Sequence, residues 1–209
     1  MKYDLIIWDF NGTLTDDVQI GIDSVNSVLA RRNMPQIKDV EHYRSIFCFP
    51  IIDYYKKLGF DFEKEPYSIV ANEWVKEYLS RENTMKLSKG AAEILENIKK
   101  KGITQIILSS SELGMLKREC ELLGITDYFD AILGLDNIYA GGKAEMAREW
   151  AKGKKFNALF IGDTLHDLDT ALAIGADCLL YSGGHDHLSK LEGAGVPVIS
   201  SLLDIEEHL

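Results

Sequence analysis

Several residues with catalytic potential follow directly on apolar runs of this sequence. Asp9 comes after the apolar run 5–8 and precedes Asn11-Gly12, a turn signal that bends the backbone at once. In an open parallel sheet, ligands bind in the crevice beyond the carboxyl ends of the strands. A carboxylate at this point would be held by a rigid strand and exposed to a ligand.

A pair of carboxylates stands at another predicted strand end. Asp163 and Asp167 are four residues apart across a strand-to-helix turn, so both can face the crevice that Asp9 faces. Three carboxylates without a thiolate or a paired imidazole suit a hard cation with oxygen ligands. The sequence therefore predicts a Mg²⁺ site.

A hydroxyl group and a lysine complete the set. Ser109 ends the strand predicted over 103–108, and Ser110 after it is either a phosphate ligand or a turn residue. Lys143 follows two glycines at a predicted helix start, where it can reach inward as a point charge. Hydroxyl, N–H groups, lysine and metal would together neutralise a phosphoryl group in transit.

The fold that must position these residues alternates strands with helices after residue 87. The predicted strands are 103–108, 131–133, 158–161, 178–181 and 197–199, and the predicted helices are 89–101, 112–123, 143–151, 165–174, 187–192 and one from 202. The alternation predicts an α/β fold with a Rossmann-like parallel-sheet core and helices on both faces. On one of these helices, Leu165, Leu168 and Leu172 are expected to face the sheet.

Residues 18–85 have helical patterns and no strong strand. Four predicted helices between two strand-bearing regions indicate a small all-helical cap domain inserted after the first strand. The predicted boundaries are 1–14 and 87–209 for the core and 15–86 for the cap domain. The aromatic residues between 43 and 55 are interpreted mostly as the core of this cap, with Phe49-Pro50 as candidates for lining a substrate pocket.

Composition narrows the class of protein. The chain has 209 residues, 46% of them hydrophobic, and a net charge of −10, which argues against broad contact with nucleic acid or an anionic membrane. No apolar run reaches the roughly 18 residues of a membrane span, and no signal peptide is expected. Cys48, Cys120 and Cys178 lack metal-type spacing and are expected to be buried free thiols. These features predict a cytoplasmic protein, and the oligomeric state, monomer or homodimer, stays open.

The ordered series Asp9-x-Asn11-Gly12-Thr13-Leu14-x-Asp16, Ser109, Lys143 and Gly162-Asp163-x-x-x-Asp167 resembles the motifs of the haloacid dehalogenase superfamily. The helical insert directly after the first motif resembles its phosphoglycolate-phosphatase-like branch, and the likeness spans essentially the whole chain. The resemblance implies a Mg²⁺-dependent phosphatase that hydrolyses a small phosphorylated metabolite of the phosphoglycolate type. The reaction would pass through an aspartyl phosphate.

By this resemblance Asp9 is the nucleophile, and Lys143 balances its charge while holding the phosphoryl group. The backbone carbonyl of Asn11 would bind the metal, Asp167 would support the metal site, and Thr13 would steady the loop. The implied catalytic residues are Asp9, Asn11 and Lys143, the substrate-binding residues Thr13, Ser109, Ser110 and Lys143, and the metal-binding residues Asp9, Asn11, Asp163 and Asp167.

Position 11 departs from the family pattern, which usually has a second Asp there as general acid and base. Asn11 cannot exchange a proton at neutral pH. General acid–base catalysis is typically worth about 10²–10⁴-fold, so turnover of simple alkyl phosphates is expected to be slow unless another group serves. Acyl and aryl phosphates, which have better leaving groups, would lose less.

Simpler interpretations apply to neighbouring polar residues. Asp17 is interpreted as a helix N-cap, and Asp16 as the residue that matches the family's acidic position at the cap hinge. His185 and His187 are interpreted as residues of a solvated loop, and His166 as a surface residue.

Two alternative functions stay open at this point. One is a phosphomutase, which would need a cation in the insert, where Arg44 is nearby. The other is a non-catalytic phosphate-binding protein of the same fold, with Asn11 as the sign of lost chemistry.

Overall fold

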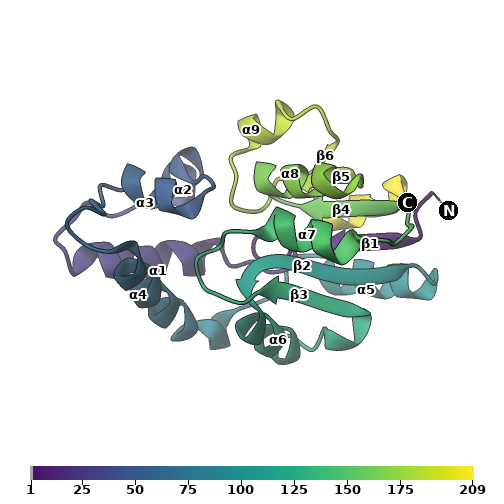
Figure 1. Ribbon diagram of the computed structural model, residues 1–209, viewed down its shortest axis with the longest axis horizontal. Coiled ribbons are helices and arrows are strands. Elements are labelled where there is room, and N and C mark those ends of the chain that lie inside the picture. Colours follow the sequence, from purple (N-terminus) through teal and green to yellow (C-terminus); the bar gives the residue numbers. More distant parts are fainter. Residues whose placement is uncertain (1) are drawn as a thin grey trace.

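The computed structural model describes residues 2–209, and its centre is a six-stranded sheet with the strand order β3-β2-β1-β4-β5-β6 (Figure 1). Every neighbouring pair of strands is parallel. The strands are β1 (Leu5–Trp8), β2 (Thr104–Glu112), β3 (Ala131–Leu135), β4 (Ala158–Gly162), β5 (Asp177–Tyr181) and β6 (Val198–Ile199). The α/β fold predicted from the alternating pattern is confirmed.

Helices cover both faces of the sheet because β1 is apolar on both sides. Ile6 and Trp8 belong to one hydrophobic cluster with α5 and α6, whereas Leu5 and Ile7 belong to another with α7 and α8. The core helices are α5 (Ala91–Lys100), α6 (Leu113–Leu122), α7 (Lys143–Ala151), α8 (Leu165–Ile174), α9 (Leu188–Glu192) and the 3₁₀ segments η2 (Thr126–Tyr128) and η3 (Leu202–His208). The alternation of side chains along a strand explains this two-sided core.

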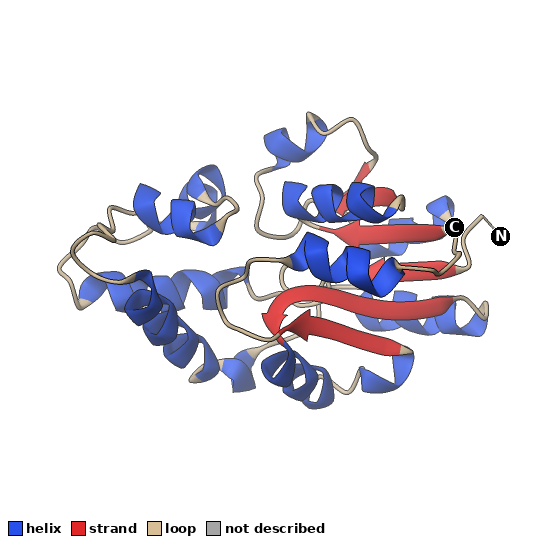
Figure 2. Cartoon of the chain, viewed as in Figure 1, coloured by secondary structure: helices blue, strands red, loops and turns tan. Residues whose placement is uncertain are grey.

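Between β1 and α5 the chain forms helices only, and they lie beyond the carboxyl ends of the strands, to which the arrowheads point (Figure 2). These are α1 (Val18–Ala30), α2 (Val40–Ile46), α3 (Ile51–Lys57), α4 (Tyr67–Leu79) and the 3₁₀ turn η1 (Glu82–Thr84). We call this segment the helical insert. Its apolar residues form a third hydrophobic cluster, separate from the two clusters of the sheet.

The two connections between the insert and the sheet lie side by side. Thr15 and Leu87 form an antiparallel bridge, and the N–H of Asp16 donates to the carbonyl of Lys86 at 2.9 Å. The chain therefore leaves the core and returns to it at one place. In residues 2–209, none of the helices is long and apolar enough to cross a membrane.

Four local predictions need correction. Strand β2 continues through Glu112 with a register shift after Leu108, so the serines after Leu108 belong to the strand. Leu172 is 66% exposed, because Thr170 and Ala171 turn toward the core in its place. Cys48 is only half-buried, whereas the other two cysteines are buried. The segment from residue 202 is a 3₁₀ helix.

Candidate active site

Six of the eight predicted site residues line one cavity of about 160 Å³ between the sheet and the helical insert. The six are Asp9, Asn11, Ser109, Ser110, Lys143 and Asp167. They come from the carboxyl ends of β1 and β2 and from the N-terminal turns of α7 and α8. Parallel strands end at a common edge, and this brings residues that are distant along the chain to the same place.

Lys143 lies at the centre of the carboxylate group. Its side chain is 1% exposed, and its Nζ donates to Oδ1 of Asp9 and, at 2.5 Å, to Oδ1 of Asp167. Burial alone would lower the pKa of Lys143, but the charges of Asp167 and Asp9 outweigh burial and hold that pKa above its ordinary value. The lysine is therefore a permanent cation beside the Asp9 carboxylate.

The three carboxylates fit a divalent metal ion. Asp9, Asp163 and Asp167 each offer an oxygen within 4.8 Å of the others, and all three residues are buried. Burial, with the charge of Asp167, raises the pKa of Asp9, and burial raises the pKa of Asp163 to about 6. One lysine cannot balance three buried negative charges, so the donor set and its charge favour a hard cation such as Mg²⁺.

Thr13 and Asp163 lie behind the cavity rather than in its wall. The hydroxyl of Thr13, which is fully buried, donates to Oδ1 of Asp163 at 2.7 Å, and the N–H of His185 donates to Oδ2 at 2.7 Å. Gly12 has a φ of +75°, and a Cβ there would lie 2.5 Å from the Asp163 carboxylate. Thr13 therefore orients Asp163. This position fits the expectation that Thr13 steadies the loop better than the expectation that it binds substrate directly.

Both polar atoms of the Asn11 side chain make hydrogen bonds. Its Nδ2 donates to Asp17 at 2.8 Å and to the Tyr78 hydroxyl at 2.9 Å, and its Oδ1 accepts from the Ser111 hydroxyl at 2.7 Å. An amide at position 11 can donate to the carboxylate of Asp17, which an ionised Asp cannot do. Asn11 thus donates to the buried carboxylate of Asp17, a residue that lies outside the motif 9–16.

Asp17 occupies the N-cap position of α1, as the sequence suggested, but its side chain does not cap the helix. Its carboxylate is buried and accepts from the N–H of Gly12 at 2.7 Å and from Tyr78 at 2.8 Å. Burial alone would raise the pKa of Asp17, but His185, with the other donors, holds it below its ordinary value. Asp16 is exposed. Of these two neighbouring residues, Asp17 is therefore the one that lines the cavity.

His185 and His166 are also placed differently from the prediction. His185 is only 9% exposed; its Nδ1 shares a hydrogen with the Tyr43 hydroxyl at 2.8 Å, and its Nε2 lies 3.4 Å from Asp17. Burial would lower the pKa of His185, but Asp17 raises it to about 9. His166 stacks on Phe49 with ring centroids 4.4 Å apart. No sequence pattern indicated these contacts, because each joins segments that are distant along the chain.

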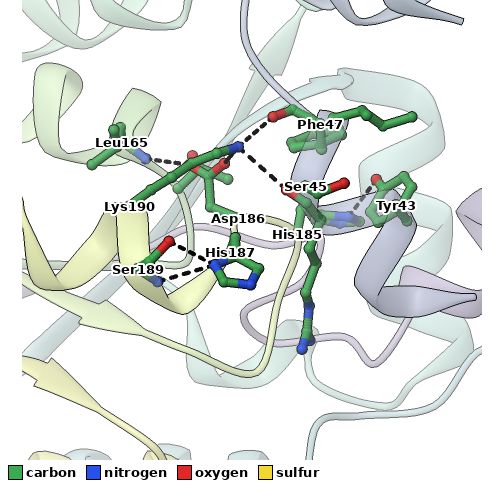
Figure 3. Close-up of polar contacts among 12 residues, drawn as sticks. Tyr43, Ser45, Phe47, Leu165, His185, Asp186, His187, Ser189 and Lys190 are labelled. Carbon is green, nitrogen blue, oxygen red and sulfur yellow. Dashed lines mark hydrogen bonds and ion pairs between the residues drawn. The ribbon is translucent and has the colours of Figure 1, made fainter.

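The segment 183–190 holds the helical insert against the core, as Figure 3 shows. Lys190 Nζ donates to the carbonyl of Phe47 at 2.6 Å and pairs with Asp186 at 3.0 Å. Asp186 in turn accepts from the N–H of Leu165 at the start of α8, at 2.9 Å. These contacts join the insert to the core on the side of α8.

Glu119 is a residue of the cavity wall that the sequence did not indicate. It lies on α6, is 1% exposed, and its Oε1 has no hydrogen-bond partner. Burial raises the pKa of Glu119 to about 8, and the charge of Asp17 adds to the rise. The signal available in the sequence was its position three residues after the buried Leu116, on the inner face of the helix.

We expect Glu119→Gln to stabilise the protein in alkaline solution. Between about pH 4.5 and pH 8 the native state keeps a proton on Glu119 that the unfolded chain loses, so this residue lowers stability as pH rises through that window. The gain should be absent near pH 4.5 and reach a few kcal/mol above pH 8, at about 1.4 kcal/mol per pKa unit. The free energy of unfolding in urea, measured near pH 4.5 and above pH 8, gives this gain, and Glu121→Gln is the control because Glu121 is exposed. An equal gain at the two pH values would contradict the prediction.

The sequence comparison decides the family. Residues 6–181 match the family described as haloacid dehalogenase-like hydrolase. The chain belongs to this family. The membership confirms the superfamily predicted from the motifs and makes the chain a member of a hydrolase family.

The proteins to which this chain is similar are distant from it in sequence. Tyrosine-protein kinase PtkA of Mycobacterium tuberculosis is 24% identical over 208 residues, covering 97% of this chain and 70% of PtkA. Putative pyrophosphatase PpaX of Caldanaerobacter subterraneus is 24% identical over 182 residues, covering 84% of this chain and 80% of PpaX. The crystal structure of a predicted phosphatase from Clostridium acetobutylicum superposes with a TM-score of 0.83 at 21% identity, covering 99% of this chain and 97% of the other. At this identity the structural likeness shows the shared fold.

Proposed function

We propose that this protein is a Mg²⁺-dependent phosphatase that hydrolyses a small phosphomonoester through an aspartyl phosphate on Asp9. The observation that carries the proposal is the convergence of Asp9, Ser109, Lys143 and Asp167 on one cavity, with Asp163 directly behind. A nucleophile, a cation and hydroxyl donors at one strand edge are the parts that phosphoryl transfer needs.

In this mechanism Lys143 holds Oδ1 of Asp9, and the second carboxylate oxygen attacks phosphorus. The bond between phosphorus and the ester oxygen breaks, and the leaving group departs with the electron pair. Lys143 then balances the negative charge of the phosphoryl oxygens, and the Ser109 hydroxyl binds one of them. Water attacks the aspartyl phosphate, which releases inorganic phosphate and restores the carboxylate. Asp9, Asp163, Asp167 and the carbonyl of Asn11 would hold Mg²⁺, which would neutralise phosphoryl charge.

We propose further that residues 15–86 are a cap domain and that 1–14 and 87–209 are the catalytic core. The insert has its own hydrophobic cluster, and its two connections lie side by side at Thr15 and Leu87. A unit attached at one place can open to admit a substrate and close to exclude water. The contacts of Lys190 with the insert belong to the closed arrangement.

A phosphomutase gains no support from the insert. Arg44, the candidate for binding a second phosphate, donates instead to the carbonyls of Gly184 and Gly183 at 2.7 and 2.6 Å. Its guanidinium therefore contributes to the contact between insert and core, and it does not line the cavity.

Metal removal tests the proposal directly. Protein treated with EDTA should lose phosphate release from p-nitrophenyl phosphate by at least about 10²-fold, and added Mg²⁺ should restore it. In a thermal scan, Mg²⁺ should raise the melting temperature of the metal-free protein. Asp167→Asn should weaken this Mg²⁺ binding by about 10- to 100-fold, whereas Asp169→Asn, an exposed neighbour on α8, should not change it. Full activity in EDTA would contradict the metal requirement.

Asn11→Asp should raise the turnover of an alkyl phosphate. The new carboxyl group would face Asp17, and two adjacent carboxylates cannot both ionise readily, so one of them would hold a proton for the leaving oxygen. We expect about a 10²-fold rise in kcat for ethyl phosphate and a much smaller rise for p-nitrophenyl phosphate. Steady-state kinetics on both esters measure it, and an unchanged ethyl phosphate rate would refute the idea.

A further inference from the structure

The cavity beside Asp9 has an aromatic wall. Eight Tyr, Phe and Trp side chains from the insert line it, and two stacked pairs frame it. Trp74 stacks on Tyr78 with centroids 4.9 Å apart, and Phe49 stacks on His166 of the core. The volume of about 160 Å³ is close to the roughly 150 Å³ of an apolar cavity that binds benzene, and it must also hold the phosphoryl group, since Asp9 and Lys143 belong to the same lining. The organic part of a substrate must therefore be compact and mostly apolar.

The wall also offers no free charge to a second ionised group. In the part of the chain that the structure describes, Lys143 is the single Lys or Arg of the lining, and Asp9 and Asp167 already bind it. The carboxylate of Asp17 is paired with His185, and Glu112 accepts from two N–H groups at the start of α6. A carboxylate or second phosphate in this space would be buried without a free cation to pair with, which is costly.

Polar atoms without partners are concentrated in this same wall. Among residues 2–209 five buried side-chain atoms lack a hydrogen bond, and four of them belong to lining residues. The four atoms are Ser110 Oγ, Tyr54 Oη, Glu119 Oε1 and His166 Nε2. Buried polar atoms are normally satisfied, so these four indicate a ligand that supplies hydrogen bonds through uncharged groups.

The side chain at position 11 restricts the leaving group. The Asn11 amide cannot act as a general acid, and it already makes hydrogen bonds to Asp17, Tyr78 and Ser111. A leaving group that departs as a stable anion needs no general acid, and a phenolate is far more stable than an alkoxide. A phenolic ester thus fits both the aromatic wall and the lack of an acid at position 11.

We infer that the substrate is an aryl phosphate, the phosphate ester of a phenolic hydroxyl on an uncharged, ring-sized molecule that carries neutral hydrogen-bonding groups. The inference rests on the proposed phosphatase function and specifies its substrate class. Asp9 would form the bond to phosphorus, the aryl C–O–P bond would break at P–O, and the phenolate would leave. Water would supply the oxygen of the released phosphate and, through the solvent, the proton of the phenol.

A substrate series tests the inference with the intact protein and Mg²⁺. The series consists of phenyl phosphate, benzyl phosphate, ethyl phosphate and phosphoglycolate. Comparing phenyl with benzyl phosphate isolates the effect of the leaving group, comparing benzyl with ethyl phosphate isolates the effect of the ring, and phosphoglycolate adds a charged group. We expect phenyl and benzyl phosphate to share a low KM and phenyl phosphate to have the higher kcat. The specificity constant kcat/KM should be lower for phosphoglycolate than for phenyl phosphate by at least about 10²-fold. A preference for phosphoglycolate or ethyl phosphate would overturn the inference.

A charge placed in the wall supplies a matched test. Val75→Arg adds a cation to the lining from α4, whereas Asn72→Arg adds the same charge to the exposed face of that helix. The first variant should raise kcat/KM for phosphoglycolate relative to phenyl phosphate by at least about tenfold, and the second should leave the ratio unchanged. An unchanged ratio in a folded Val75→Arg protein would contradict the claim that the lack of a free cation in the wall disfavours a charged substrate.

Binding without turnover separates the two proposals. Calorimetry with phenylphosphonate and phosphonoacetate, which cannot be hydrolysed at an ester bond, measures recognition alone. At least about tenfold tighter binding of phenylphosphonate supports the aryl site even if no ester is turned over, in which case only the phosphatase function fails. Hydrolysis together with tighter phosphonoacetate binding would leave the phosphatase function standing and overturn the aryl assignment.

Discussion

Asp9→Asn is expected to reduce phosphate release by at least about 10⁴-fold, because an amide oxygen cannot replace the carboxylate as the attacking nucleophile. The fold should survive the change, since the new side chain has nearly the same volume and Lys143 keeps its bond to Asp167. The measurement is single-turnover release of phosphate from p-nitrophenyl phosphate with Mg²⁺ in excess.

Asp16→Asn is the matched control, because Asp16 is an exposed carboxylate seven residues farther along the chain. Its rate should stay within about twofold of the unmodified protein. Beryllium fluoride with Mg²⁺, a mimic of an aspartyl phosphate, should raise the melting temperature of the unmodified protein and of Asp16→Asn but not of Asp9→Asn. Retention of a tenth or more of the rate in Asp9→Asn would exclude Asp9 as the nucleophile.

Lys143→Met should impair both catalysis and folding stability. The change removes the cation that balances Asp9 and the phosphoryl oxygens, so kcat should fall by about 10³-fold. It also leaves Asp9 and Asp167 buried without their partner, and breaking a buried pair in this way costs about 3–5 kcal/mol. Lys152→Met, an exposed change just after α7, should alter neither quantity.

The stability loss in Lys143→Met should depend on pH with a definite sign. Burial already raises the pKa values of Asp9 and Asp163, and loss of the lysine raises that of Asp9 further. The native state then holds protons that the unfolded chain loses above about pH 4, so stability falls as pH rises from there. Urea unfolding in EDTA at pH 5 and pH 8 measures it; a variant that is more stable at pH 8 than at pH 5 would contradict this electrostatic account.

The sheet, the helical insert and the residues at the strand ends could be predicted from the order of the amino acids alone. In a chain that alternates strands with helices, an apolar run such as 5–8 is buried between two layers of helices, and parallel strands bring their carboxyl ends to one edge. For this reason Asp9, Ser109, Lys143 and Asp167 were expected at a single place, and they line the same cavity. These inferences use local pattern and a general rule of topology.

Which other polar groups enter the cavity depends on how the segments pack, and local patterns did not indicate it. Asp17 resembles a helix cap and His185 a loop residue until the fold brings them within 3.4 Å of one another. Glu119 is one of many helical glutamates until the insert covers it and raises its pKa. The reason is physical: burial and hydrogen-bond partners arise from packing between segments that are far apart in the chain, and no local pattern encodes which of them will meet.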